Sequence, residues 1–200
     1  MKNIYLILIV LIPLSCKAQI PIYGLETSAF DVPNNSYIKD INNDFNKYTG
    51  TWKFENTTQE FTLNIGKKTM YYDGHLNVYK DLLYGEYQYK ENGVTFINTL
   101  PNFTVATDPY DNAIQGRNLT SAKNFPICHS CPANELRVKL SISDPDRPWV
   151  NAYIVLRYVN NQGVESLVAS IFYTQTVVPN DNTTPVDLRM PIGEYTLLKQ

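Results

Sequence analysis

This 200-residue chain has few charged side chains and no cluster of basic residues. Charged residues make up 18% of the sequence, and the formal net charge is −2. Because a nucleic-acid-binding surface needs grouped Lys and Arg side chains, we expect no nucleic-acid partner. Only two histidines occur, His75 and His129, which is too few for a histidine-rich metal site. We therefore expect neither a bound metal nor a cofactor.

Motifs of the common hydrolases are also missing. No Gly-x-Ser-x-Gly stretch occurs, and neither histidine lies in a catalytic motif. No EF-hand pattern is present, and most acidic residues lie in polar turns, where solvation accounts for them. A pair of carboxylates of the glycoside-hydrolase type stays open as an alternative. The pattern favours a protein that is not an enzyme.

The longest apolar run is too short to cross a membrane. It covers residues 4–14, after the positively charged Lys2, whereas a bilayer core of ~30 Å needs about 20 residues. This arrangement predicts an export signal. The Leu-Ser-Cys stretch that ends at Cys16 resembles a bacterial lipobox, which makes Cys16 the lipid-bearing first residue of the mature chain. Ordinary cleavage after Ala18 is the alternative, but it leaves the lone Cys16 without a role.

These features predict a signal peptide over residues 1–18, a tether over residues 19–33 and a single domain over residues 34–200. The expected location is the bacterial cell envelope, where a lipid anchor holds the protein at the outer membrane or facing the periplasm. Secretion of an unanchored protein is the alternative.

Two further cysteines, Cys128 and Cys131, form a Cys-x-x-Cys motif between prolines. A redox motif of this kind normally follows a strand and opens a helix, which lowers the pKa of the first thiol; here a strand-like stretch comes next. A zinc site needs two more ligands, and no second cysteine pair exists. Since export permits disulfides, we expect a local disulfide that fixes a long loop. Free thiols and thiol chemistry are the alternatives.

Periodicity predicts one short helix followed by a series of strands. Residues 34–47 predict a helix: Ser36 can cap it, and apolar side chains recur every four positions after Ser36. From Gly50 the period changes to two, which is typical of strands separated by polar turns. The expected turns lie at residues 56–58, 66–68, 73–74 and 91–93. The last of them contains Asn-Gly, the strongest short hairpin signal.

The second half of the chain returns to strands after an irregular stretch. Residues 101–132 hold several prolines and both loop cysteines, so we expect a long connection with a short strand near residues 103–106. Further strands are predicted at residues 135–143, 149–158, 164–178 and 193–200. An open sheet of this size exposes two edges to pairing, and closure removes them. We therefore predict an all-β fold, an antiparallel meander that closes into a barrel, with a two-sheet β-sandwich as alternative.

Several stretches resemble a known family. The signal ending in SCKAQ, the stretches SYIKDINNDFNKYTGTWKF and EFTLNIGKK, and the ending GEYTLLKQ resemble uncharacterised lipoproteins of the Bacteroidota, which are classed as a domain of unknown function. The resemblance implies an envelope location and an all-β, lipocalin-like body. It brings no activity, substrate or catalytic residue with it.

A looser resemblance is to the lipocalins, whose first barrel strand begins with Gly-x-Trp. Gly50 and Trp52 match this motif. The resemblance implies that Trp52 seals the base of the barrel and that an arginine near the last strand stacks on it, a cation–π contact worth roughly 0.5–2 kcal/mol. Arg189 is the candidate for this arginine. All three residues would be structural and would not bind a ligand.

Tyrosine is abundant, and three tyrosines lie close together at Tyr84, Tyr87 and Tyr89. A wall of tyrosines can bind a sugar or an apolar ligand through flat ring faces and hydroxyls. The alternative, which we favour, is that these side chains simply fill the barrel wall. Tyr87 and Tyr89 share one face of a strand, and Tyr84 joins them only if a bulge occurs at Gly85.

Two hypotheses about function follow from these observations. The first is a non-enzymatic envelope lipoprotein that binds a small apolar or glycan ligand inside a lipocalin-like barrel or at its mouth. The second is a structural or interaction module that binds another envelope protein through an exposed strand or through residues 101–132.

Overall fold

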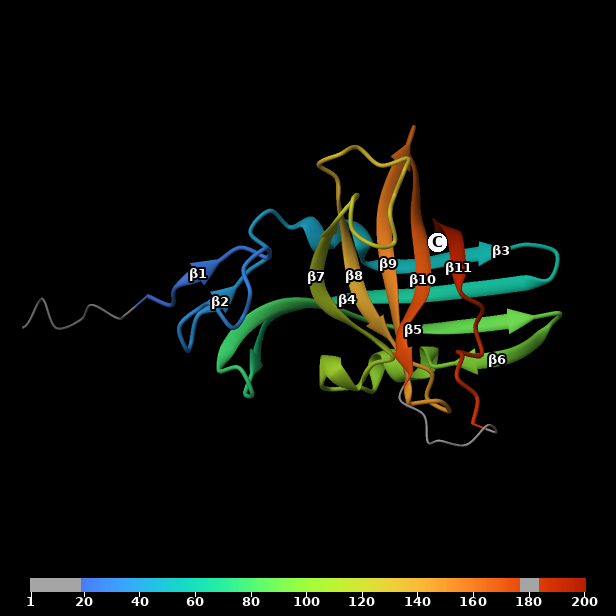
Figure 1. The fold of residues 1–200 in the computed structure, drawn as a ribbon, viewed down its shortest axis with the longest axis horizontal. Coiled ribbons are helices and arrows are strands. Elements are labelled where there is room, and N and C mark those ends of the chain that lie inside the picture. The colour runs from blue at the N-terminus through green and yellow to red at the C-terminus, as the bar shows by residue number, and fades with distance from the viewer. Residues whose placement is uncertain (1–18, 177–183) are drawn as a thin grey trace, which may run out of the picture.

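Eight antiparallel strands close into a β-barrel (Figure 1). The computed structural model describes residues 19–176 and 184–200, and the predicted signal peptide with Cys16 lies outside them. The barrel strands, in the order in which they pair, are β3 (Gly50–Glu55), β4 (Gln59–Asp73), β5 (Val78–Glu91), β7 (Ile114–Ser121), β8 (Leu136–Ile142), β9 (Val150–Asn161), β10 (Val164–Thr176) and β11 (Gly193–Lys199). The last strand, β11, pairs with β3 and closes the barrel, so the all-β barrel prediction is confirmed.

Side chains fill the interior of the barrel. The inward residues of the strands are mostly apolar and buried, and they include Trp52, Phe61 and Tyr87. The ring of Phe61 meets those of Tyr87 and Tyr195 edge to face, with centroids 6.2 and 5.5 Å apart. An eight-stranded barrel is just wide enough for its own side chains to fill it. Two cavities, of about 610 and 60 Å³, lie on the outside of this core.

The long strands β4 and β5 continue beyond the barrel as a curved hairpin (Figure 1). The turn predicted at residues 66–68 is therefore wrong, because β4 passes through it and turns only after Asp73. Gly66 pairs with Tyr84 of β5, and the Tyr84 ring packs over Gly66 in the space that a Cβ would need. The glycine therefore allows this close cross-strand contact within a continuous strand. The strand bends instead at Met70, which has a φ of 52° at a register shift in the β4–β5 pairing.

The N-terminal segment packs on this hairpin. Two short parallel strands, β1 (Ile22–Tyr23) and β2 (Tyr37–Ile38), pair with each other, and β2 pairs with β5. Leu25, within the stretch expected to be a tether, is buried against the barrel core. These residues therefore belong to the folded body.

The helix predicted over residues 34–47 is wrong in extent, because only a 3₁₀ helix, η2 (Asp44–Tyr48), forms there. Ser36 does not cap it. Instead, the Asp40 carboxylate accepts hydrogen bonds from the N–H groups of Asp44 and Phe45, at 2.7 and 3.0 Å. The preceding residues are held as strand β2, since the Tyr37 hydroxyl donates to the buried Asp81 carboxylate at 2.5 Å.

The long connection predicted over residues 101–132 contains an unpredicted barrel strand, β7. Two 3₁₀ helices, η3 (Leu100–Thr104) and η4 (Pro109–Asp111), precede it, and β6 (Val94–Asn98) pairs with β5 outside the barrel order. Alternation is weak in β7 because its pairing with β8 shifts register between Gln115 and Asn118. This bulge contains Gly116, with a φ of 147°, and breaks the period of two.

Candidate functional site: a groove on the outer face of the barrel

The three candidate ligand-wall tyrosines do not form one wall. Tyr87 and Tyr89 point into the packed interior and are buried, where the Tyr87 hydroxyl donates to the carbonyl of Ser143 at 3.0 Å. The pairing of β4 with β5 is regular at Gly85, so no bulge turns Tyr84 inward. Tyr84 lies on the outer face and stacks on Phe103 of η3, with ring centroids 5.4 Å apart. These rings pack the fold and leave no shared binding surface.

Trp52 occupies the barrel core and is fully buried. Its indole N–H donates to the carbonyl of Tyr48 in η2 at 2.9 Å, and the ring of Tyr158 meets it edge to face. The cation over the indole ring is Lys199, with Nζ 5.3 Å from the centroid, where the lipocalin resemblance implied Arg189. Because Lys199 ends β11 and pairs with Trp52, the last strand itself brings this cation to the ring.

Arg189 instead binds the carboxylate of Asp144 in the turn between β8 and β9. It precedes β11 and holds the Asp144 carboxylate through its backbone N–H and its side chain, with Nε 2.9 Å from Oδ2. Asp144 is completely buried. Burial alone would raise the pKa of Asp144, but the hydrogen bonds and charge of Arg189 outweigh it and leave the pKa below its ordinary value. Arg189 therefore closes a turn of the barrel.

A groove of about 610 Å³ runs along the outside of the barrel. Its floor is formed by outward side chains of β7, β8 and β9, among them Arg117, Lys139 and Tyr153. Its walls are residues 25–30 of the N-terminal segment and Tyr110 of η4. We call this the outer groove. Its volume falls in the range of about 300–1,000 Å³ typical of small-molecule sites.

Arg117 stands at the junction of the floor and the N-terminal wall. The bulge at Gly116 interrupts the alternation of β7 just before it. The guanidinium donates to the carbonyls of Leu25 and Thr27, both at 3.2 Å, and so fixes the wall against the barrel. Burial lowers the pKa of Arg117, with a smaller opposing effect of Tyr110. No carboxylate pairs with this arginine among the described residues.

Lys139 places a second cation in the outer groove. Its Nζ lies 4.0 Å from the centroid of the Tyr153 ring and 5.6 Å from that of Phe172. Within the part of the chain that the structure describes, Lys139 forms no ion pair. A third cation, Lys80, is already paired with Asp73 at 2.5 Å and lies over the Tyr110 ring. Among the residues that the structure describes, the groove thus holds two cations without carboxylate partners beside two tyrosine rings, and Glu26 is the one acidic residue that lines it.

The side chains that line the outer groove are mostly polar, cationic and aromatic. The side chains that line the outer groove include neither histidine nor cysteine. No cluster of three or more potential metal ligands occurs in residues 19–176 and 184–200. Cations beside aromatic faces instead match a ligand with an anionic group and a flat, partly apolar body. Sequence reasoning did not find these residues, because Arg117 and Lys139 look like ordinary outward positions of strands until the N-terminal segment covers them.

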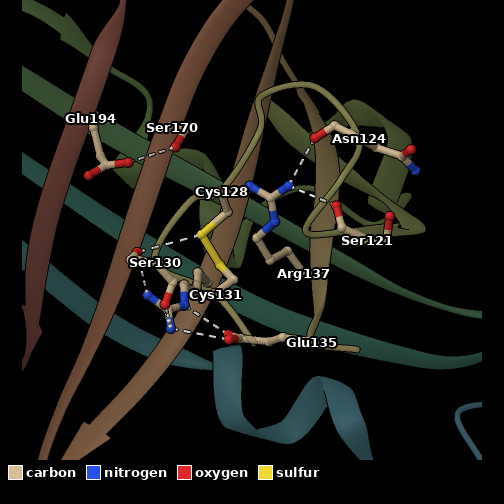
Figure 2. Close-up of a disulfide and its surroundings, with 10 residues drawn as sticks. Ser121, Asn124, Cys128, Ser130, Cys131, Glu135, Arg137, Ser170 and Glu194 are labelled. Atoms are coloured by element: carbon tan, nitrogen blue, oxygen red, sulfur yellow. Dashed lines mark hydrogen bonds and ion pairs between the residues drawn. A yellow bond between two sulfur atoms is a disulfide. The ribbon is translucent and has the colours of Figure 1, made fainter. Parts of the chain in front are cut away.

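The two loop cysteines lie on another part of the outer surface. Cys128 and Cys131 are joined in a disulfide, with their Cα atoms 5.4 Å apart, in the loop between β7 and β8 (Figure 2). Arg137 of β8 donates from Nη2 to the carbonyls of Ser121 and Asn124, at 2.9 and 3.1 Å, and holds this loop against the barrel. No described helix is long and apolar enough to span a bilayer.

Comparison with known proteins identifies a family. A family model described as a family of unknown function (DUF6705) matches residues 1–200, the whole chain. The chain therefore belongs to this family. No curated protein and no solved structure matches it.

Proposed function

We propose that this member of a family of unknown function is a non-enzymatic, exported binding protein. Its ligand is a short glycan that carries an acidic group, and its site is the outer groove. The observation that supports this most directly is the pair of cations, Arg117 and Lys139, that face a groove of about 610 Å³ and have no carboxylate partner in residues 19–176 and 184–200. The packed interior argues against a ligand inside the barrel.

The chemistry of the outer groove sets the expected contacts. Lys139 lies over the Tyr153 ring, and its flexible side chain can turn its ammonium group toward a ligand carboxylate, sulfate or phosphate. Tyr110 is 41% exposed and lines the outer groove together with Tyr153, whose ring is partly covered by Lys139. Aromatic side chains of this kind suit a sugar ring, which presents an apolar face and hydroxyls. Arg117 is held by the N-terminal wall, so it contributes charge from a fixed position.

Export and anchoring remain part of this proposal. The positive residue, apolar run and Leu-Ser-Cys stretch at the N-terminus support a lipid-anchored protein of the bacterial cell envelope. Metabolic labelling with a palmitate analogue should label the wild-type protein and leave Cys16→Ala unlabelled. Equal labelling of both proteins would contradict the anchor and leave the binding proposal untouched.

Calorimetric titration tests the ligand class. We expect a uronic-acid disaccharide to bind and the matching neutral disaccharide to bind at least about tenfold more weakly, since one charged hydrogen bond is worth ~1.5–3 kcal/mol. Lys139→Met should reduce the affinity for the acidic sugar by about tenfold or more. The matched control is Lys68→Met, which removes an exposed cation outside the groove and should leave binding unchanged. Equal affinity for both sugars, or no effect of Lys139→Met, would contradict the proposal.

A second candidate function has its own observation. Phe125 and Ile127, in the loop between β7 and β8, are 67% and 59% exposed. Exposed apolar side chains of this size suit contact with another envelope protein. Phe125→Ser together with Ile127→Ser should abolish capture of an envelope protein while leaving sugar binding intact. Unchanged capture would rule out this loop as the contact.

A further inference from the structure

Arg137 of β8 lies beneath the disulfide loop as a buried cation. The residue is only 3% exposed, and its Nε finds no hydrogen-bond acceptor among the described residues. It forms no ion pair in that part of the chain, and the two carbonyls that it contacts bind Nη2 alone. A buried cation without an anionic partner costs free energy. Its environment therefore favours a negative charge beside it.

Two groups at the cavity beside Arg137 can carry a negative charge, the Glu194 carboxylate and a Cys128 thiolate. The Glu194 carboxylate accepts a hydrogen bond from the Ser170 hydroxyl at 3.3 Å and forms no ion pair with Arg137 among the described residues, so we assign the charge beside Arg137 to Cys128. Arg137 and Cys128 line the same cavity of about 60 Å³. Figure 2 shows both side chains at the disulfide loop.

The loop wraps around the guanidinium, since Cys128 donates its N–H to the carbonyl of Ala122 while Arg137 holds the carbonyls of Ser121 and Asn124. The Ser130 hydroxyl lies 3.7 Å from Cys128 Sγ and can donate to a thiolate at that position.

The second arginine at this cavity is already neutralised. Arg157 lines the cavity too, but its Nε and Nη2 bind the two carboxylate oxygens of Glu135 at 2.9 and 3.1 Å. Arg137, in contrast, forms no ion pair within residues 19–176 and 184–200, although the charges of Glu135 and Glu194 act on it from a greater distance. The usual Cys-x-x-Cys motif opens a helix, whose N-terminus stabilises the first thiolate. No such helix follows Cys128, and Arg137 provides the equivalent positive charge from β8.

We propose that Cys128 and Cys131 form a thiol–disulfide exchange site in which Arg137 stabilises the Cys128 thiolate. The partner is a dithiol of an exported protein. Its first thiolate attacks Cys131 Sγ, so that a mixed disulfide forms, the Cys128–Cys131 bond breaks, and the electron pair leaves on Cys128. The partner's second thiolate then attacks its own sulfur in the mixed disulfide and releases the Cys131 thiolate.

The exchange balances in atoms and electrons. The partner dithiol loses two electrons and two protons and becomes a disulfide, and the disulfide of this chain becomes a dithiol. Cys131 is the expected point of attack because Cys128 is the better leaving group: a thiol with a stabilised thiolate leaves faster. This activity is independent of the sugar-binding proposal and uses a different face of the barrel.

The pH dependence of alkylation tests the proposal directly. In Cys131→Ser, iodoacetamide modification of Cys128, followed by peptide mass spectrometry to separate it from Cys16, should show a midpoint at least about one pH unit below the ordinary thiol value of ~8.5. Arg137→Met in the same background should return the midpoint to ~8.5, whereas Lys123→Met, a charge control on the same loop, should not. A midpoint less than about one pH unit below ~8.5 with Arg137 intact would overturn the proposal, whether or not Arg137→Met folds.

A second measurement tests the direction of attack. Wild-type protein treated with reduced glutathione and quenched with acid should carry the glutathione adduct on Cys131. An adduct mainly on Cys128 would overturn the assignment of the leaving group.

Discussion

The buried Asp144 at the β8–β9 turn offers the sharpest test of how the barrel is held closed. Asp144→Asn keeps the shape of the side chain and removes its charge. The Asp144 carboxylate accepts hydrogen bonds from Arg189 N, Nε and Nη2 and from the N–H of Asp146. An asparagine amide would turn a donor toward the guanidinium, so at least one of these hydrogen bonds is lost and Arg189 loses its buried counter-charge.

The expected loss follows from these contacts. Breaking a fully buried ion pair costs roughly 3–5 kcal/mol. Arg189 keeps a contact with Asp146, at 2.5 Å, and its side chain is 23% exposed. We therefore expect Asp144→Asn to lower the free energy of unfolding at pH 7 by about 2–4 kcal/mol. The matched control, Asp146→Asn, removes a carboxylate that is 70% exposed and should cost less than about 1 kcal/mol.

The effect must depend on pH in a definite direction. Because the pKa of Asp144 is lowered in the folded protein, its contribution to stability is present above the unfolded value of ~3.9 and is lost as the pH falls below it. Urea unfolding of both proteins at pH 7, 5, 4 and 3 should show wild type and Asp144→Asn converging toward the acid end. A difference that stays constant from pH 7 to 3, or a loss below about 0.5 kcal/mol at pH 7, would refute the role given to this pair.

Two further predictions concern the buried Glu86 and the cation over Trp52. Burial raises the pKa of Glu86, against opposing hydrogen bonds from Thr99 and Ala113, and its Oε2 has no donor among the described residues. Because the pKa of Glu86 is raised in the folded protein, its ionised carboxylate destabilises the fold at neutral pH, and this cost disappears when the group is protonated at acid pH. Glu86→Gln should therefore increase the free energy of unfolding, measured by urea titration, by about 1 kcal/mol at pH 7 and by less at pH 4. Equal changes at both pH values would contradict this. Lys199→Met removes the cation over the Trp52 indole and should lower the free energy of unfolding by up to ~1 kcal/mol. It should also shift the fluorescence emission of Trp52, measured in a Trp149→Phe background. An unchanged spectrum would contradict that contact.

The sequence predicted the strands whose residues alternate clearly. The strand at Leu136–Ile142 shows this alternation, whereas the hairpin of β9 and β10 was predicted from denser apolar runs around a polar turn; the structure contains these strands and the predicted closing strand β11. The Asn92-Gly93 turn was also predicted from local sequence, because Asn and Gly tolerate the positive φ that such a turn requires. Both residues adopt positive φ in the structure. Where short-range chemistry decides the structure, the sequence was sufficient.

The errors have a common physical cause, which is contact between distant residues. Residues 37–38 become strand because Asp81, more than forty positions away, accepts the Tyr37 hydroxyl. Lys199 rather than Arg189 lies over Trp52 because the register of β11 on β3 decides which cation reaches the ring. The outer groove could not be predicted, since it exists only where the N-terminal segment meets β7 through Arg117.

A chemical-shift titration tests most directly whether ligand binds outside the barrel. Isotope-labelled protein is titrated with the uronic-acid disaccharide, and backbone and lysine resonances are followed. We predict saturable shifts at Tyr110, Lys139 and Tyr153, which line the outer groove, with Trp52 and Tyr87 in the packed interior unchanged. Shifts confined to the interior residues, or no saturable shift in the groove, would contradict the account.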